Sequence, residues 1–128
     1  MSDSKTPSCE CQAAPKLIFA CSGAADVGRL ADLAARQMTA KGIGKMFCLA
    51  GVGGRVSGIM ESTKAARAIL AIDGCELECV RHCLEEAGFT EFQHLRLDTM
   101  GFKKGETKVT GEAVDRVVEE GRKLLENT

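Results

Sequence analysis

The chain has 128 residues, 45% of them hydrophobic, which fits one compact domain with its own core and is short for two. Its 17 basic and 18 acidic residues almost cancel, and aromatic residues make up only 4%, with no Trp and no Tyr. The sequence therefore lacks both the basic surface and the stacking rings of a nucleic-acid-binding protein, and we expect no nucleic-acid partner.

The amino-terminal stretch MSDSKTPSCECQAAPK has no apolar segment of the kind that a secretion signal contains. No later stretch approaches the roughly 18 consecutive apolar residues that a membrane span needs. We therefore expect a cytoplasmic protein without a membrane partner. Residues 1–15 show no hydrophobic periodicity, so we expect a flexible arm carrying Cys9 and Cys11, followed by one domain over residues 16–128.

Apolar residues follow two different periods along residues 16–128. Short apolar runs rich in strand-forming residues predict strands over 16–21, 45–50, 67–73 and 92–97. Apolar residues at helical spacing predict helices over 27–38, 56–66, the segment between Cys75 and Gly88, and 114–125. The third of these helices is expected to direct four apolar residues toward the core, namely Leu77, Val80, Leu84 and Ala87.

This alternation of strands and helices predicts the class and topology of the fold. Strands joined through helices pair in parallel by right-handed crossovers, which place helices on the sheet faces. We predict a single-domain α/β fold with an open, mainly parallel four-stranded sheet and helices on both faces. The order 2-1-3-4 is the simplest that covers both faces. The carboxyl ends of such strands share one edge, where α/β proteins keep their binding sites.

The sequence contains seven cysteines, which is many for its length, and their odd number argues against a closed disulfide framework. In a reducing compartment, clustered thiols indicate metal binding or redox chemistry, although a single free cysteine is often only a small buried hydrophobic residue. Four of the seven lie at the ends of the predicted strands or soon after them: Cys21, Cys48, Cys75 and Cys79. We expect these four thiols to meet at the carboxyl edge of the sheet.

Four thiolates around one ion give the tetrahedral site that Zn²⁺ favours. The sequence therefore predicts a zinc site with these four cysteines as ligands. A closed site favours a structural, storage, sensing or transfer role, whereas a loose ligand would leave a position for Lewis-acid chemistry. Two points stay open. The first is whether Cys75 and Cys79 share one face of the helix or Cys75 lies just ahead of its start. The second is whether Cys48 is a metal ligand or only a buried core residue.

Two other chemistries fit the same cysteines. The first is a thiol redox enzyme, in which Cys75 at a helix N-terminus has a lowered thiol pKa and Cys79 or Cys21 resolves the mixed disulfide. The second is an iron–sulfur cluster, which four thiolates also suit. The sequence does not decide between these chemistries and zinc binding, or whether the protein is an enzyme.

Other residues near this edge have simpler roles open to them. Residues 22–25 could bind an anion through backbone N–H groups, or form a plain turn before the helix. Arg55 could offset the negative charge of a four-thiolate centre, or lie in solvent. Asp73 ends a strand, where a carboxylate can accept hydrogen bonds from a helix N-terminus. His82 is a further ligand candidate, and Cys83 is expected to pack beneath its helix.

Three stretches, ACSGAADVG, KMFCLAGVGG and AIDGCELEC, closely resemble the DGC-domain proteins, small bacterial proteins named for an Asp-Gly-Cys triplet that stands here at residues 73–75. The resemblance runs from about residue 16 to about residue 105. It implies a zinc-binding protein whose recurring cysteines are the four selected above, namely Cys21, Cys48, Cys75 and Cys79. It supplies no reaction, and Cys9, Cys11 and Cys83 fall outside its pattern.

Overall fold

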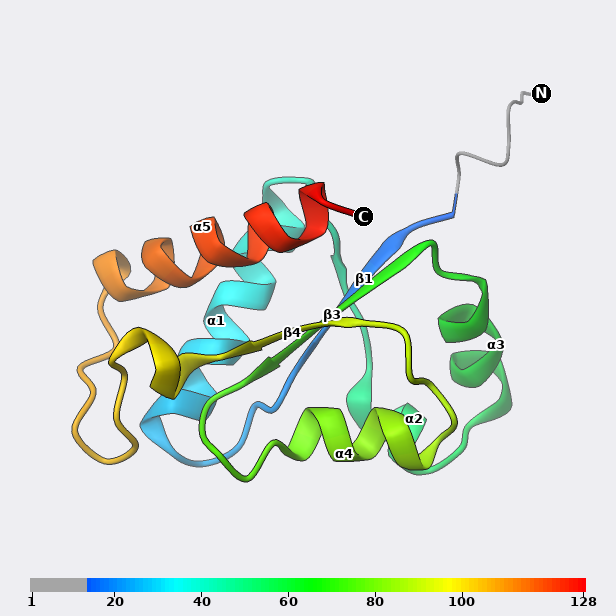
Figure 1. The fold of residues 1–128 in the computed structure, drawn as a ribbon, viewed down its shortest axis with the longest axis horizontal. Coiled ribbons are helices and arrows are strands. Elements are labelled where there is room, and N and C mark those ends of the chain that lie inside the picture. Colours follow the sequence, from blue (N-terminus) through cyan, green and yellow to red (C-terminus); the bar gives the residue numbers. More distant parts are fainter. Residues whose placement is uncertain (1–13) are drawn as a thin grey trace.

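The computed structural model describes residues 14–128. Four parallel strands form one sheet in the order β2-β1-β3-β4, and their bounds are β1 (Lys16–Ala20), β2 (Lys45–Met46), β3 (Ala68–Asp73) and β4 (Gln93–Arg96). The register pairs Ala20 of β1 with Ile72 of β3, so these two central strands end at the same level of the sheet. The predicted α/β class and strand order are confirmed (Figure 1).

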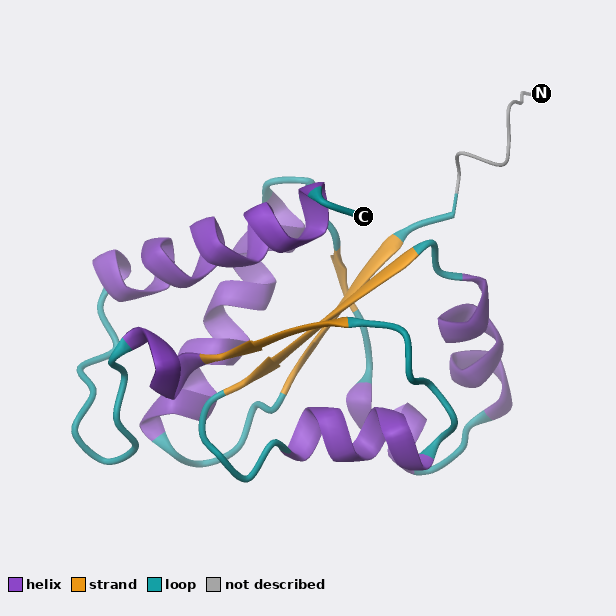
Figure 2. Cartoon of the chain, in the orientation of Figure 1, coloured by secondary structure: helices purple, strands orange, loops and turns teal. Residues whose placement is uncertain are grey.

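Helices cover both faces of the sheet (Figure 2). The first face carries α1 (Asp26–Ala40) and α5 (Gly111–Glu126). The second face carries α2 (Leu49–Gly53), α3 (Ser57–Ala65) and α4 (Cys79–Glu86). A 3-10 turn, η2 (Leu97–Met100), follows β4. No helix in the described part of the chain is both long and apolar enough to span a membrane.

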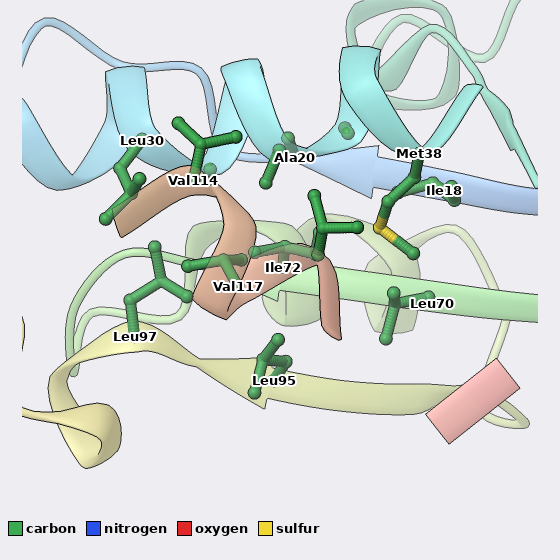
Figure 3. Close-up of a cluster of buried hydrophobic side chains, with 14 of the residues drawn as sticks. Ile18, Ala20, Leu30, Met38, Leu70, Ile72, Leu95, Leu97, Val114 and Val117 are labelled. Atoms are coloured by element: carbon green, nitrogen blue, oxygen red, sulfur yellow. The ribbon is translucent and has the colours of Figure 1, made fainter. Parts of the chain in front are cut away.

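Alternate residues of the central strands build the core on the first face. Ile18 and Leu70 are fully buried there against α1 and α5, as Figure 3 shows. Helix α1 contributes side chains at helical spacing, among them Leu30 and Met38, and these are also fully buried. Burying each such side chain stabilises the fold by about 1.5–3 kcal/mol before the cost of ordering the chain.

The intervening strand residues build a second core on the opposite face. Leu17 and Phe19 of β1 pack with Val52 of α2 and with Val80 and Leu84 of α4. Because both faces of the sheet are buried, the strands read as continuous apolar runs rather than as alternating ones. This second core fixes α2 and α4 against the sheet and so positions the residues at their amino-terminal ends.

Two local predictions were wrong in extent. The strand expected over 45–50 comprises only Lys45–Met46, because Cys48 already caps α2 and its Sγ accepts a hydrogen bond from the Gly51 N–H at 3.3 Å. Leu77 was expected in the core but is 57% exposed. It lies in a turn, since α4 begins only at Cys79.

Candidate functional site

The turns that follow β1 and β3 pack closely at the carboxyl edge. The Cys21 N–H donates to the Ile72 carbonyl at 3.2 Å, which continues the pairing of the two strands to their ends. A Cβ on Gly74 would lie 2.7 Å from a side-chain carbon of Val27 in α1. Only glycine therefore lets the turn after β3 approach α1 so closely, and this approach brings Cys75 to the same edge as Cys21.

Asp73 fixes where α4 begins. Its carboxylate is buried and accepts hydrogen bonds from the backbone N–H groups of Val80 at 2.8 Å and Arg81 at 3.2 Å. Its Oδ2 also lies 2.8 Å from Nε2 of His94. The prediction that Asp73 accepts hydrogen bonds from a helix N-terminus is confirmed. Because these amides are the unpaired donors of the first helical turn, Asp73 sets Cys79 at the first helical position.

Two of the four predicted ligands adjoin residues with left-handed backbone. Ser22 follows Cys21 with φ of 50°, and Glu78 precedes Cys79 with φ of 55°. Such a conformation costs a non-glycine residue about 1–2 kcal/mol, so surrounding contacts must hold it. The Ser22 hydroxyl donates to Asp32 at 2.7 Å, and the Glu78 carboxylate pairs with Arg81 and, at 3.3 Å, with Arg96.

Five cysteines line two adjoining cavities at this edge. The larger cavity, of about 640 Å³, is lined by Cys21, Cys48, Cys79 and Cys83. The smaller cavity, of about 390 Å³, is lined by Cys21, Cys75 and Cys79. Cys21 and Cys79 line both cavities and therefore lie on the boundary between them. The fold thus brings all four predicted ligands to one edge, but divides Cys75 from Cys48.

The thiols are not gathered around a common point. Among residues 14–128, no group of three or more Cys, His, Asp or Glu side chains is placed to hold a metal ion. The Cys48 Sγ is turned back toward α2, where it accepts the Gly51 N–H hydrogen bond. Cys48 and Cys79 are exposed, which excludes the alternative that Cys48 is a core residue. Cys75 lies just ahead of α4, which decides between the two placements left open above.

Burial controls the charge of two of these thiols. Burial raises the pKa of the Cys21 thiol, the neighbouring charges of Asp73 and Cys75 raise it further, and backbone N–H groups only partly oppose this. Burial also raises the pKa of the Cys83 thiol, against the lowering effect of Arg55. Both groups are therefore protonated at neutral pH, and binding a metal through either one would release a proton.

Cys83 packs against the second core beneath its helix, as expected, and is half-buried there. It also lines the larger cavity, which sequence reasoning did not predict. The available signal was its spacing, since residues four apart on a helix lie on one face and Cys79 stands four residues before it. His82 is exposed on α4 and is not among the residues that line either cavity.

Arg55 lies beside Cys83, where its charge acts on that thiol. Its guanidinium donates to the carbonyls of Val52 at 2.9 Å, Gly53 at 3.1 Å and Glu86 at 3.0 Å. It therefore ties the carboxyl-terminal ends of α2 and α4 together. Cys9 and Cys11, which were expected on a flexible arm, lie outside the described residues.

Comparison with known proteins matches this part of the chain. A family model for the DGC domain matches residues 17–120, which include all five cavity cysteines. The chain is also similar to the "Anaerobic and virulence modulator AnvM" of Pseudomonas aeruginosa, with 40% identity over 88 residues that cover 69% of this chain and 67% of AnvM. No solved structure matches the chain significantly.

Proposed function

The chain belongs to the DGC-domain family, and we propose that it is a zinc-binding protein with Cys21, Cys48, Cys75 and Cys79 as ligands. One observation carries this proposal: cysteines from separate segments of the chain line two adjoining cavities at one edge of the sheet. Zn²⁺ prefers thiolate ligands in tetrahedral geometry, so the donor chemistry of this edge suits it.

Zinc binding at this edge requires the thiols to turn toward one another on a fixed backbone. Cys48 and Cys79 are exposed at the starts of α2 and α4, so their side chains can change rotamer without disturbing the core. The Cys48 side chain gives up only its hydrogen bond from Gly51. The backbone itself is held by Asp73 and by the close approach of Gly74 to α1.

The four cysteine ligands also indicate what the bound metal does. A site with four thiolate ligands has no open coordination position, which favours storage, sensing or transfer of the metal over catalysis. The relative AnvM is named as a modulator, and on that basis we extend a regulatory role to this chain. The proposed metal site would make that role one of metal sensing. Free thiols persist in a reducing compartment, so the proposal places the protein in the cytoplasm.

Thiol redox chemistry is the second candidate, and the structure changes its nucleophile. Cys79, not Cys75, occupies the first position of α4, so the helix N-terminus expected to carry the attacking thiol carries Cys79. The raised pKa of the Cys21 thiol makes Cys21 a poor attacking group in this scheme. An iron–sulfur cluster would use the same thiols as zinc.

Elemental analysis of protein purified without added metal, together with its absorption spectrum, separates these candidates. The proposal predicts a colourless protein with about one zinc ion per chain, as a four-cysteine site requires. A brown protein containing iron and sulfide would establish the cluster instead. A metal-free protein whose thiols react rapidly with disulfides would support the redox enzyme.

A further inference from the structure

Cys83 and Cys79 form a pair on one face of α4. They stand four residues apart, a spacing that places side chains next to each other on a helix, and both line the larger cavity. Cys48 lines the same cavity from the start of α2. The Cys83 Sγ lies 3.9 Å from the carbonyl oxygen of Leu49, the residue that follows Cys48. The Cys83 thiol is therefore next to the segment that carries Cys48.

The surroundings of Cys83 differ from those of a cysteine that only fills the core. Its side chain is half-buried and borders a cavity instead of being enclosed. A Cβ on Gly53 would lie 3.5 Å from the Cys83 Sγ, so no side chain at that position stands against the sulfur. The Arg55 guanidinium, held by three backbone carbonyls, places a positive charge beside it.

We propose that Cys83 is a fifth metal-binding thiol, which together with Cys48 completes a second ligand set in the larger cavity. Cys21, Cys48 and Cys79 belong to both sets, and Cys21 and Cys79 also line both cavities. One set adds Cys75 from the smaller cavity, and the other adds Cys83. The ligand is a thiophilic divalent cation such as Zn²⁺, Co²⁺ or Cd²⁺, and each thiol that binds it loses its proton to solvent.

This inference rests on the proposed function, because it assigns a further ligand to the same metal-binding edge. Its consequence is that the cation can pass between the two sets by exchanging Cys75 for Cys83 while Cys21, Cys48 and Cys79 stay bound. Loss of Cys75 then leaves four thiols, and loss of Cys75 and Cys83 together leaves three. The number of thiolates around the metal in these two variants therefore shows whether Cys83 is a ligand.

Cobalt spectroscopy on the reduced, metal-free full-length protein measures that number, because sulfur-to-cobalt charge-transfer absorbance rises with each thiolate ligand. We expect Cys75→Ser to keep the absorbance of a four-thiolate centre and Cys75→Ser/Cys83→Ala to lose about one quarter of it. The double variant should also bind cobalt about tenfold more weakly than Cys75→Ser, the change that ~1.4 kcal/mol produces. Cys75→Ser/His82→Ala is the matched control and should equal Cys75→Ser.

Alkylation with N-ethylmaleimide, followed by peptide mass spectrometry, measures the reactivity of the Cys83 thiol directly in the unmutated protein. Cys83 should be alkylated more slowly once Cd²⁺ is added, as Cys48 and Cys79 should be. The inference is overturned, and the zinc-binding function stands, if Cys75→Ser already shows a three-thiolate spectrum and Cd²⁺ leaves the alkylation of Cys83 unchanged. If the unmutated protein binds neither Co²⁺ nor Cd²⁺, the proposed function fails and this inference fails with it.

Discussion

At the scale of single residues, each member of the Asp-Gly-Cys triplet has its own physical task. The Asp73 carboxylate accepts two backbone N–H groups of α4 and contacts His94. Gly74 permits an approach to Val27 that any Cβ would prevent. Cys75 then lies in the smaller cavity beside Cys21. The triplet thus anchors a helix, brings two turns together and presents a thiol within three consecutive positions.

The first prediction tests the anchoring role of Asp73. Asp73→Ala leaves buried amides of α4 without their acceptor, which should lower the free energy of unfolding by about 1–3 kcal/mol in urea denaturation. Asp98→Ala is the control, because Asp98 pairs with Arg96 near the surface and such a pair contributes only about 0–1 kcal/mol. Equal losses in the two variants would contradict the assignment of Asp73 as the anchor of α4.

The second prediction concerns the two cysteines on the boundary between the cavities. Cys79→Ser removes a thiol from both ligand sets, so it should lose more bound zinc than Cys75→Ser, which removes a thiol from one. The measurement is zinc retained per chain after dialysis against a weak chelator. Full zinc retention by Cys79→Ser would exclude Cys79 from the metal site. Equal zinc loss in both variants would show that Cys79 does not belong to both ligand sets.

At the scale of elements, hydrophobic periodicity predicted the strands and helices because both faces of the sheet are buried and each helix has one apolar face. It did not predict where α4 begins. That start depends on Asp73, which lies seven residues before Val80 and acts through a tertiary contact. The short extent of β2 likewise follows from the capping role of Cys48, which an apolar run conceals.

The same reasoning explains how much of the site was predictable. Strand ends share an edge in any parallel sheet, so the placement of Cys21, Cys75 and Cys79 at one edge followed from the topology. The division of this edge into two cavities depends on how α2 and α4 pack, which periodicity does not specify. Cys83 was therefore assigned to the core, although its spacing from Cys79 already placed the two on one face of α4.

The third prediction belongs to α1 and the loop that crosses its start. The Asp26 carboxylate accepts hydrogen bonds from the N–H groups of Gly105 and Thr107, both at 2.9 Å, and these bonds hold its pKa below the usual range. Because the folded-state pKa is lowered, this tether is present above the pKa of the unfolded chain. It is lost as pH falls through the folded-state pKa.

Amide chemical shifts of Gly105 and Thr107, followed by NMR during acid titration, test this tether. We expect both to titrate with Asp26, at a pH below the usual Asp value of about 3.9, and to lose that transition in Asp26→Asn. A midpoint at or above the usual value, or an unchanged transition in the variant, would show that Asp26 does not hold the loop.

At the scale of the whole molecule, the two opposite edges of the sheet carry different residues. The thiols line the carboxyl edge, while the described chain starts at the opposite edge, where the Pro15 carbonyl accepts the Arg67 N–H at 3.0 Å. Lys16 also reaches the carboxyl-terminal end of α5, donating to the Leu125 carbonyl at 2.8 Å. The first described residues, Ala14 and Pro15, therefore lie at the edge opposite the thiols.

The fourth prediction follows from covalent reach. Cys11 precedes Pro15 by four residues, which extend over at most about 14 Å, whereas Cys21 follows Pro15 by six residues of mostly β-strand, or about 20 Å. Cys11 would therefore need an almost fully extended chain folded back along β1 to approach Cys21 in its own molecule, which disfavours a role for the Cys9–Cys11 pair at the cavities. Deleting residues 1–13 should leave the rate of zinc loss to a chelator unchanged in dilute protein. Faster loss at every protein concentration would contradict this.

The central claim is that the carboxyl edge holds zinc through cysteine sulfur, and X-ray absorption at the zinc edge tests it most directly. Protein purified without added metal should show a first shell of four sulfur atoms at about 2.3 Å, the distance and number of a tetrahedral thiolate site. A shell dominated by nitrogen or oxygen at about 2.0–2.1 Å, or no zinc in the folded protein, would contradict the claim.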